Sequence, residues 1–106
     1  MRVTHTSLEE TVRIEGVEHE ASISLIVSRN EPGEGTRLHR HPYDETWIVQ
    51  RGSVTFQADE STRRTGPGDV ITVAAGTPHK FTNDGPGRCE LICIHPSPSI
   101  VEEHLE

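Results

Sequence analysis

Short stretches of alternating apolar and polar residues, separated at close spacing by turn residues, run through most of this 106-residue chain. Successive side chains of a β-strand point to opposite faces, so such stretches indicate strands that are buried on one side. Hydrophobic residues make up only 31% of the chain and aromatic residues 4%, which is too little for a core built from thick helices. A strand needs only every second residue to be apolar, and the sequence therefore predicts an all-β fold in a single domain, residues 1–106.

Turn residues divide the chain into eight or more expected strands. The strongest turn cluster is Asn83-Asp-Gly-Pro-Gly87, and residues 16–20 are also expected to form a turn. Residues 58–64 are expected to be a polar connection. Many short strands joined by glycine- and proline-containing turns favour an antiparallel sandwich or barrel. The expected strands are residues 11–15, 21–29, 36–41, 45–50, 53–57, 69–73, 79–82 and 88–95.

The last ten residues, 97–106, differ in character from the strands before them. Ser99 is followed three residues later by Glu102, which is the spacing of a helix capping box. The sequence therefore predicts one short C-terminal helix in this segment.

Charge and composition argue against several classes of partner. The net charge of −7 disfavours nucleic acid and anionic membranes, which both require a basic face. No apolar stretch approaches the ~20 residues of a membrane span, and the N-terminus lacks the apolar part of a signal peptide. Cys89 and Cys93 share one expected strand, where their Cα atoms would lie roughly 13 Å apart, too far for a disulfide. Free thiols favour a reducing, cytoplasmic location.

One short stretch holds a His-x-His pair followed four residues later by a glutamate: His39, His41 and Glu45. Positions i and i+2 of a strand project from the same face, so the two imidazoles can converge on one ion. Pro42 turns the chain, and an antiparallel neighbour can then bring the Glu45 carboxylate beside them. Two histidines and one carboxylate on one side of a metal leave positions open on the other side. On this spacing alone, surface histidines on an edge strand remain an equal alternative.

Two longer patterns remove that ambiguity. The first spans residues 33–52 and reads Gly33-x5-His39-x-His41-x3-Glu45-x6-Gly52. It resembles the first motif of the cupin superfamily position for position. The second spans residues 68–83, reads Gly68-x5-Ala74-x-Gly76-x2-His79-x3-Asn83, and resembles the second cupin motif. The one departure is Ala74, where the family usually has a proline that shapes a turn and touches no metal.

The resemblance implies a small cupin, with the double-stranded β-helix or jelly-roll barrel of that family and six-stranded sheets. It also implies that His39, His41, Glu45 and His79 bind one divalent transition metal in the barrel mouth. The metals that cupins commonly hold are iron, manganese, nickel, copper and zinc. Some members of the superfamily bind no metal, but this chain has all four ligand positions.

Five further residues are candidates for the pocket around such a metal. Counting alternately from Glu45 and His79 places Trp47 and Phe81 on the inward face, as pocket walls or as plain core. Arg37 shares a face with His39 and is suited either to a substrate carboxylate or to a salt bridge at the rim. His95 and Tyr43 are candidate catalytic groups, although Tyr43 can equally face solvent. His95 shares its face with Cys93, and His104 is expected at the surface.

The fold leaves the reaction open, because cupins include several enzyme types and non-enzymatic binders. The first hypothesis is a metal-dependent oxidoreductase of dioxygenase type, in which iron or manganese acts on a small chelating organic substrate. The second is an isomerase or cyclase that uses the metal as a Lewis acid, with a base such as His95. The third is a non-catalytic module that binds a small molecule.

A homodimer is also expected. The low aromatic content limits the core of one chain, and strands 11–15 and 21–29 precede the motifs as a separable pair. Small cupins often pair through such strands, and pairing would cover an open sheet edge.

Overall fold

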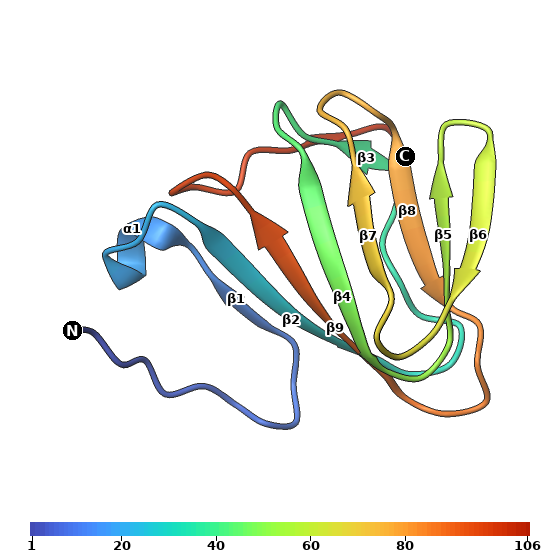
Figure 1. Cartoon of the computed structure of the whole chain (residues 1–106), viewed down its shortest axis with the longest axis horizontal. Helices are drawn as coiled ribbons and strands as arrows, with labels where there is room; N and C mark the ends of the chain where they lie inside the picture. Colours follow the sequence, from blue (N-terminus) through green and yellow to red (C-terminus); the bar gives the residue numbers. More distant parts are fainter.

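The computed structural model describes all residues 1–106 as two facing antiparallel sheets of five strands each (Figure 1). The first sheet has the order β1-β2-β9-β4-β7, and the second has the order β10-β3-β8-β5-β6. The expected all-β jelly-roll fold is confirmed, although each sheet has five strands where the family resemblance implied six. The elements are β1 (Val12–Ile14), α1 (Gly16–His19), β2 (Ser24–Asn30), β3 (His39–Arg40), β4 (Glu45–Arg51), β5 (Val54–Ala58), β6 (Ser61–Thr65), β7 (Val70–Val73), β8 (His79–Asn83), β9 (Cys89–His95) and β10 (Glu103–His104).

Two elements differ from the sequence-based expectation. The segment expected to be a turn contains α1, a single helical turn that ends at Glu20 in the left-handed region, with φ of 56°. The segment expected to be a polar connection contains β6, which pairs with β5 over five residues. β6 is an edge strand with exposed polar side chains on both faces, so it lacks the alternation that would reveal a strand. No helix of the structure has the length and apolar character needed to cross a membrane.

The predicted C-terminal helix is wrong. The tail instead forms β10, which pairs with β3 so that Glu103 lies opposite Arg40 and His104 lies opposite His39. The Leu105 N–H donates to the Leu38 carbonyl at 2.9 Å, and the Arg40 guanidinium lies 3.0 Å from the Glu103 carboxylate. A helix cap contributes only about 1 kcal/mol, and here the open edge of β3 offers backbone and ion-pair contacts that local sequence does not reveal.

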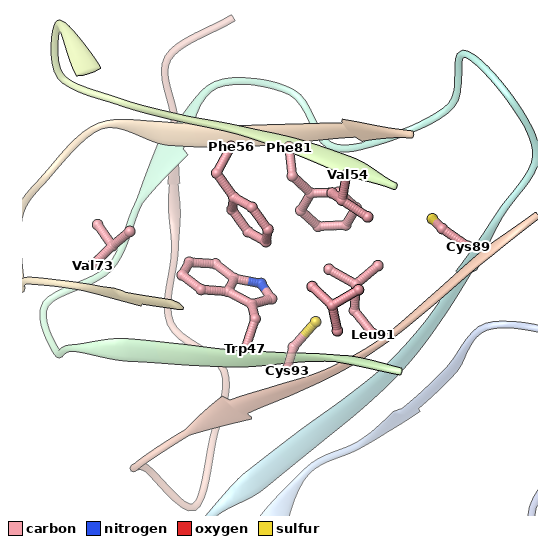
Figure 2. Close-up of a cluster of buried hydrophobic side chains, with 9 residues drawn as sticks. Trp47, Val54, Phe56, Val73, Phe81, Cys89, Leu91 and Cys93 are labelled. Carbon is pink, nitrogen blue, oxygen red and sulfur yellow. The ribbon is translucent and has the colours of Figure 1, made fainter. Parts of the chain in front are cut away.

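The core lies between the two sheets, and alternate residues of the central strands build it. In β9, every second side chain from Cys89 to His95 is buried. The Trp47 ring from the first sheet meets the Phe56 ring from the second, with centroids 5.1 Å apart, and Phe56 packs on Phe81 at 5.6 Å. Figure 2 shows these three rings facing one another between the sheets. The aromatic residues are few, but they are concentrated at one contact between the sheets.

The same alternation continues into a polar end of the barrel. Glu45 lies two positions before Trp47 on β4, and His79 lies two positions before Phe81 on β8; all four side chains are buried. The Trp47 and His79 rings are 5.3 Å apart between centroids. The hydrophobic core therefore continues directly into the group of candidate metal ligands, and the packing of the core positions the strands that carry them.

Gly35 offers a direct test of the sheet packing. It bridges to Thr82 beside β8, and a Cβ atom at this position would overlap the Phe81 carbonyl oxygen. Gly35→Ala should therefore lower the free energy of unfolding by about 1–3 kcal/mol, as overpacking does in a well-packed interior. The measurement is urea unfolding. The matched control is Gly66→Ala, where a Cβ atom would have no neighbour within 4 Å; equal stability of the two variants would contradict the close approach.

Candidate metal centre

Four side chains from both sheets converge at the polar end of the barrel. His39 begins β3, His41 follows that strand, Glu45 begins β4 and His79 begins β8. His39 and His79 lie directly opposite each other where β3 pairs with β8. All four residues are buried, and one donor atom from each lies within 4.8 Å of the others. The structure thus brings together the four residues that the motifs single out, in a group that can hold a metal ion.

Backbone carbonyls orient the three imidazoles. The Nδ1 atom of His39 lies 2.6 Å from the Arg37 oxygen, and that of His79 lies 2.8 Å from the Thr77 oxygen. The Nδ1 atom of His41 lies 2.8 Å from the Val101 oxygen. A carbonyl oxygen only accepts, so in each neutral ring Nδ1 carries the hydrogen and donates it. Nε2 is then the unprotonated nitrogen in all three rings, which is how proteins orient histidines toward metals.

The donor set fits a cation. The Nε2 atoms of His41 and His79 lie 2.8 and 3.2 Å from the same carboxylate oxygen, Oε1 of Glu45. The His41 contact is not aligned as a hydrogen bond, and its buried Nε2 has no hydrogen-bond partner. Unprotonated imidazole nitrogens and a carboxylate are all acceptors, so their convergence is unfavourable unless a proton or a cation lies among them. Three imidazoles and one carboxylate suit a divalent transition metal.

The group is electrostatically coupled. Burial disfavours the charged form of Glu45, but the close contacts of His41, His79 and His95, which attract the carboxylate when their Nε2 atoms carry a proton, outweigh it and hold the pKa of this carboxyl far below its usual range. Burial lowers the pKa of His39. For His41, burial acts in the same direction, but the Glu45 carboxylate and the Val101 carbonyl outweigh it and raise the pKa. Glu45 therefore remains a carboxylate, the form that binds a cation.

Tyr43 and His95, the two candidate catalytic residues, form a chain that reaches Glu45. The Val101 N–H donates to the Tyr43 hydroxyl oxygen at 3.2 Å, and that hydroxyl lies 2.7 Å from Nδ1 of His95. The hydroxyl can donate to Nδ1 or accept from it; when it donates, Nε2 carries the hydrogen of the neutral His95 ring. That Nε2 lies 3.2 Å from Oε2 of Glu45, close enough for an ion pair but not aligned as a hydrogen bond. His95 thus faces the carboxylate oxygen that His41 and His79 do not contact.

The C-terminal tail takes part in this site, which sequence reasoning missed. Val101 contacts His41 through its carbonyl and Tyr43 through its N–H, although it lies about 60 positions further along the chain. These are backbone contacts, so no side-chain pattern in the sequence could have revealed them. Asp44 was also missed: its carboxylate accepts the Ala75 N–H at 2.8 Å, and the Gly76 N–H donates to the His41 carbonyl at 2.8 Å. Both contacts hold the turn in which Ala74 replaces the usual proline.

A cavity of about 370 Å³ extends from the four-residue group to the surface between the sheets. The three candidate pocket residues, Arg37, Trp47 and Phe81, all line it. Trp47 and Phe81 belong to the core and also line the cavity, and their contact with a substrate stays a prediction. Arg37 is exposed and has no carboxylate within ion-pair distance; Glu106, whose pKa it helps to lower, is paired with Lys80 instead. His95 and Cys93 line the cavity too, and burial raises the pKa of the Cys93 thiol well above its usual range.

The rim of the cavity combines β1 with the C-terminal tail. Arg13 from β1 lies 3.9 Å from Glu102, and Glu102 lies 3.3 Å from Nε2 of His104. His104 is exposed, as expected, but it also lines the cavity. Its place was not predictable because it depends on the pairing of β10 with β3.

Fold and site together place the chain among small β-barrel proteins that can bind a metal ion in the mouth of the barrel. The model of the Cupin domain family matches residues 27–95, well over half of the chain, and the chain belongs to this family. The matched range contains all four convergent residues and His95. No curated protein sequence matches the chain.

Solved structures share the fold at low sequence identity. The oxalate decarboxylase of Lactobacillus farciminis in its formate complex gives a TM-score of 0.80 at 20% identity, over 98% of this chain and 33% of its own. An oxalate oxidase in complex with the substrate analogue glycolate gives 0.79 at 15% identity, over 99% of this chain and 60% of its own. An uncharacterized conserved protein from Klebsiella pneumoniae with a double-stranded β-helix domain gives 0.75 at 21% identity, over 97% and 90%. The chain thus spans less than two thirds of the length of the oxalate enzymes.

The four-residue assignment predicts about one transition-metal ion per chain in protein purified without a polyhistidine tag. His79→Ala should lower metal affinity by more than about 100-fold, since even loss of an outer hydrogen-bond partner costs about 10–100-fold. Elemental analysis and competition with a chelator measure occupancy and affinity. His5→Ala, which removes an exposed histidine, is the matched control and should bind as the unaltered protein does. Full occupancy of the His79→Ala protein would refute the assignment.

Proposed function

We propose that this protein is a metal-dependent enzyme of dioxygenase type that acts on a small chelating organic substrate. The observation that carries the proposal is that two of the four convergent residues, His39 and Glu45, line a cavity that opens to the surface. Donors gathered on one side of an ion leave coordination positions toward the cavity for substrate. A purely structural metal site would have no need of such access.

The ion would supply the one-electron chemistry that dioxygen requires, and iron and manganese are the metals suited to it. In a dioxygenase reaction both oxygen atoms of O2 enter the organic product, so the reaction needs no separate reductant. The chain itself would fix the donors, bind the substrate and exclude water. Trp47 and Phe81 would shield the inner end of the cavity from solvent.

His95 and Tyr43 would have different roles. His95 lines the cavity and can meet a substrate, whereas Tyr43 lies behind it and acts through the 2.7 Å contact with Nδ1. With hydrogen on Nε2, His95 can donate toward the cavity or toward Oε2 of Glu45; if that proton is transferred, the Tyr43 hydroxyl proton moves to Nδ1, which keeps the ring neutral and leaves a tyrosinate. We propose His95 as the proton donor of the site and Tyr43 as its positioning partner.

A second candidate is a Lewis-acid isomerase or cyclase, and the same residue favours it. Such an enzyme moves a proton between two positions of one substrate, and His95 is a buried titratable side chain of the cavity wall, outside the four convergent residues, that can carry it. This reaction would need neither oxygen nor a redox-active ion, and zinc would serve as well as iron.

Oxygen uptake separates the two candidates. Iron-loaded protein mixed with catechol should consume oxygen, while zinc-loaded protein should consume none above the protein-free control, because zinc has no accessible second oxidation state. His95→Ala should lower the rate by about 100-fold, within the range of general acid catalysis. An oxygen electrode gives the rates, and iron in buffer is the further control. Equal uptake with iron and zinc would end the dioxygenase proposal.

We also propose a homodimer that pairs along β1. This strand has a partner on one side only, and the segment before it exposes Val3 and Leu8 with 83% and 81% of their surface accessible. A second copy would cover both the open edge and these apolar side chains. Sedimentation velocity at micromolar concentration should give a dimer, and Arg13→Pro in β1 should shift it toward monomer because proline is poorly tolerated in a paired strand. A monomer in the unaltered protein would rule the pairing out.

We infer further that residues 1–106 act as one cupin domain in a reducing cytoplasm. Cys89 and Cys93 are buried and unpaired, which supports this location. The net charge of −7 supports the absence of a nucleic-acid partner.

A further inference from the structure

The cavity is much larger than the four convergent residues require. Its volume of about 370 Å³ corresponds to roughly a dozen water molecules at about 30 Å³ each. Oxalate, the two-carbon dianion named for two of the structural neighbours, would fill only a small part of it. The remaining wall is mostly apolar, with Ile26, Trp47 and Phe81 as its hydrophobic faces. The volume and the hydrophobic part of the lining therefore favour a ligand with an apolar body.

Trp47 adds a polar group to that wall. Its side chain is 1% exposed, and its buried Nε1–H has no oxygen or nitrogen acceptor, only the weakly accepting Cys93 sulfur beside it. Figure 2 shows the indole nitrogen on the edge of the ring that faces Cys93, and both residues line the cavity. A buried donor without a strong acceptor is unfavourable, and a ligand with an acceptor at this point would satisfy it.

Arg37 is the arginine of the cavity wall that has no carboxylate within ion-pair distance. Two arginines line it, but Arg13 is already held by Glu15 at 3.4 Å and by Glu102 at 3.9 Å. Arg37 forms no ion pair and lies two positions from His39, which corresponds to roughly 6–7 Å along an extended chain. The net charge of −7 would repel anions from a distance, but at physiological salt it is screened beyond about 8 Å. Inside the cavity, Glu102 is already paired with Arg13 and His104, and Glu45 lies among the histidines, so Arg37 is the cation of the wall that a ligand carboxylate could pair with.

We propose that the site binds an organic carboxylate with an apolar body, whose carboxylate meets Arg37 while a chelating group at its other end faces the four convergent residues. The body lies against Ile26 and Phe81, and an acceptor on it takes the hydrogen bond of the Trp47 Nε1–H. The inference rests on the proposed function, because it names the substrate class of the same site. It makes Arg37 and Trp47 the residues that set specificity.

Calorimetry on zinc-loaded protein, in which no oxidation occurs, can compare the affinities of three small molecules. The probe 3,4-dihydroxybenzoate has the chelating head, the apolar body and the carboxylate; catechol lacks the carboxylate, and oxalate lacks the body. The first should bind about tenfold more tightly than either of the others, the effect of one charge-assisted hydrogen bond. Equal affinity for 3,4-dihydroxybenzoate and catechol would overturn the role of Arg37.

Substitutions locate the effect. Arg37→Ala leaves the backbone carbonyl that orients His39, so zinc binding should persist while affinity for 3,4-dihydroxybenzoate falls about tenfold, to that for catechol. Arg37→Lys should recover part of the loss. Arg51→Ala is the matched control, because Arg51 is exposed, unpaired and at the opposite end of β4 from Glu45. A loss that is equal in the Arg37 and Arg51 variants would also overturn the proposal.

Trp47 provides an independent signal. It is the only tryptophan of the chain, so a ¹H–¹⁵N spectrum contains a single indole resonance, and 3,4-dihydroxybenzoate should shift it. The same titration on metal-free protein should give weaker binding that still depends on Arg37. If zinc does not bind, the proposed function fails while this titration still tests the carboxylate site. An indole signal that stays unmoved at saturation places the ligand outside the cavity and refutes the inference.

Discussion

Every second side chain of β4, β8 and β9 points between the sheets, and this alternation links the site to the core. The inward rows run from Glu45 to Trp47, from His79 to Phe81 and from Cys93 to His95. The contact of Trp47 with Phe56 fixes the distance between the sheets. Since Glu45 and His79 come from opposite sheets, the same contact sets how closely their donor atoms approach. The arrangement needs only a small aromatic core, placed next to the polar end that it supports.

The buried carboxylate of Glu45 carries a large desolvation free energy, because a charged group is removed from water. An isolated carboxylate in such a position would take up a proton, yet the surrounding imidazoles hold its pKa far below the usual range. Backbone carbonyls orient the imidazoles of His39, His41 and His79, whereas the Tyr43 hydroxyl contacts that of His95. The orientation therefore depends on the path of the main chain, including a tail that begins far from the motifs in sequence. Without that path the rings could rotate, and their Nε2 atoms would no longer converge with the Glu45 carboxylate.

Residues from both ends of the chain line the mouth of the cavity. Arg13 comes from the N-terminal strand and Glu102 from the tail, and they meet at 3.9 Å across the gap between the two sheets. Neither sheet closes this side of the barrel by strand pairing, because β1 and β10 are both edges. The cavity thus lies where the jelly roll is open, beside the group that can bind metal.

The sequence by itself determined the all-β class and most strand positions, and its resemblance to the two cupin motifs identified the four convergent residues. It could do so because strand alternation and ligand spacing are local properties of the chain, as in His39 and His41. β6 and the C-terminal tail were not predictable from local pattern. β6 has polar side chains on both faces, and the capping-box signal at Ser99 is weaker than the pairing of the tail with β3. Only the tertiary structure decided that the Val101 carbonyl orients His41 and that Tyr43 reaches Glu45 through His95. It also decided that Arg37 lines the cavity without an ion pair. These contacts join segments that are brought together by sheet packing and not by sequence spacing.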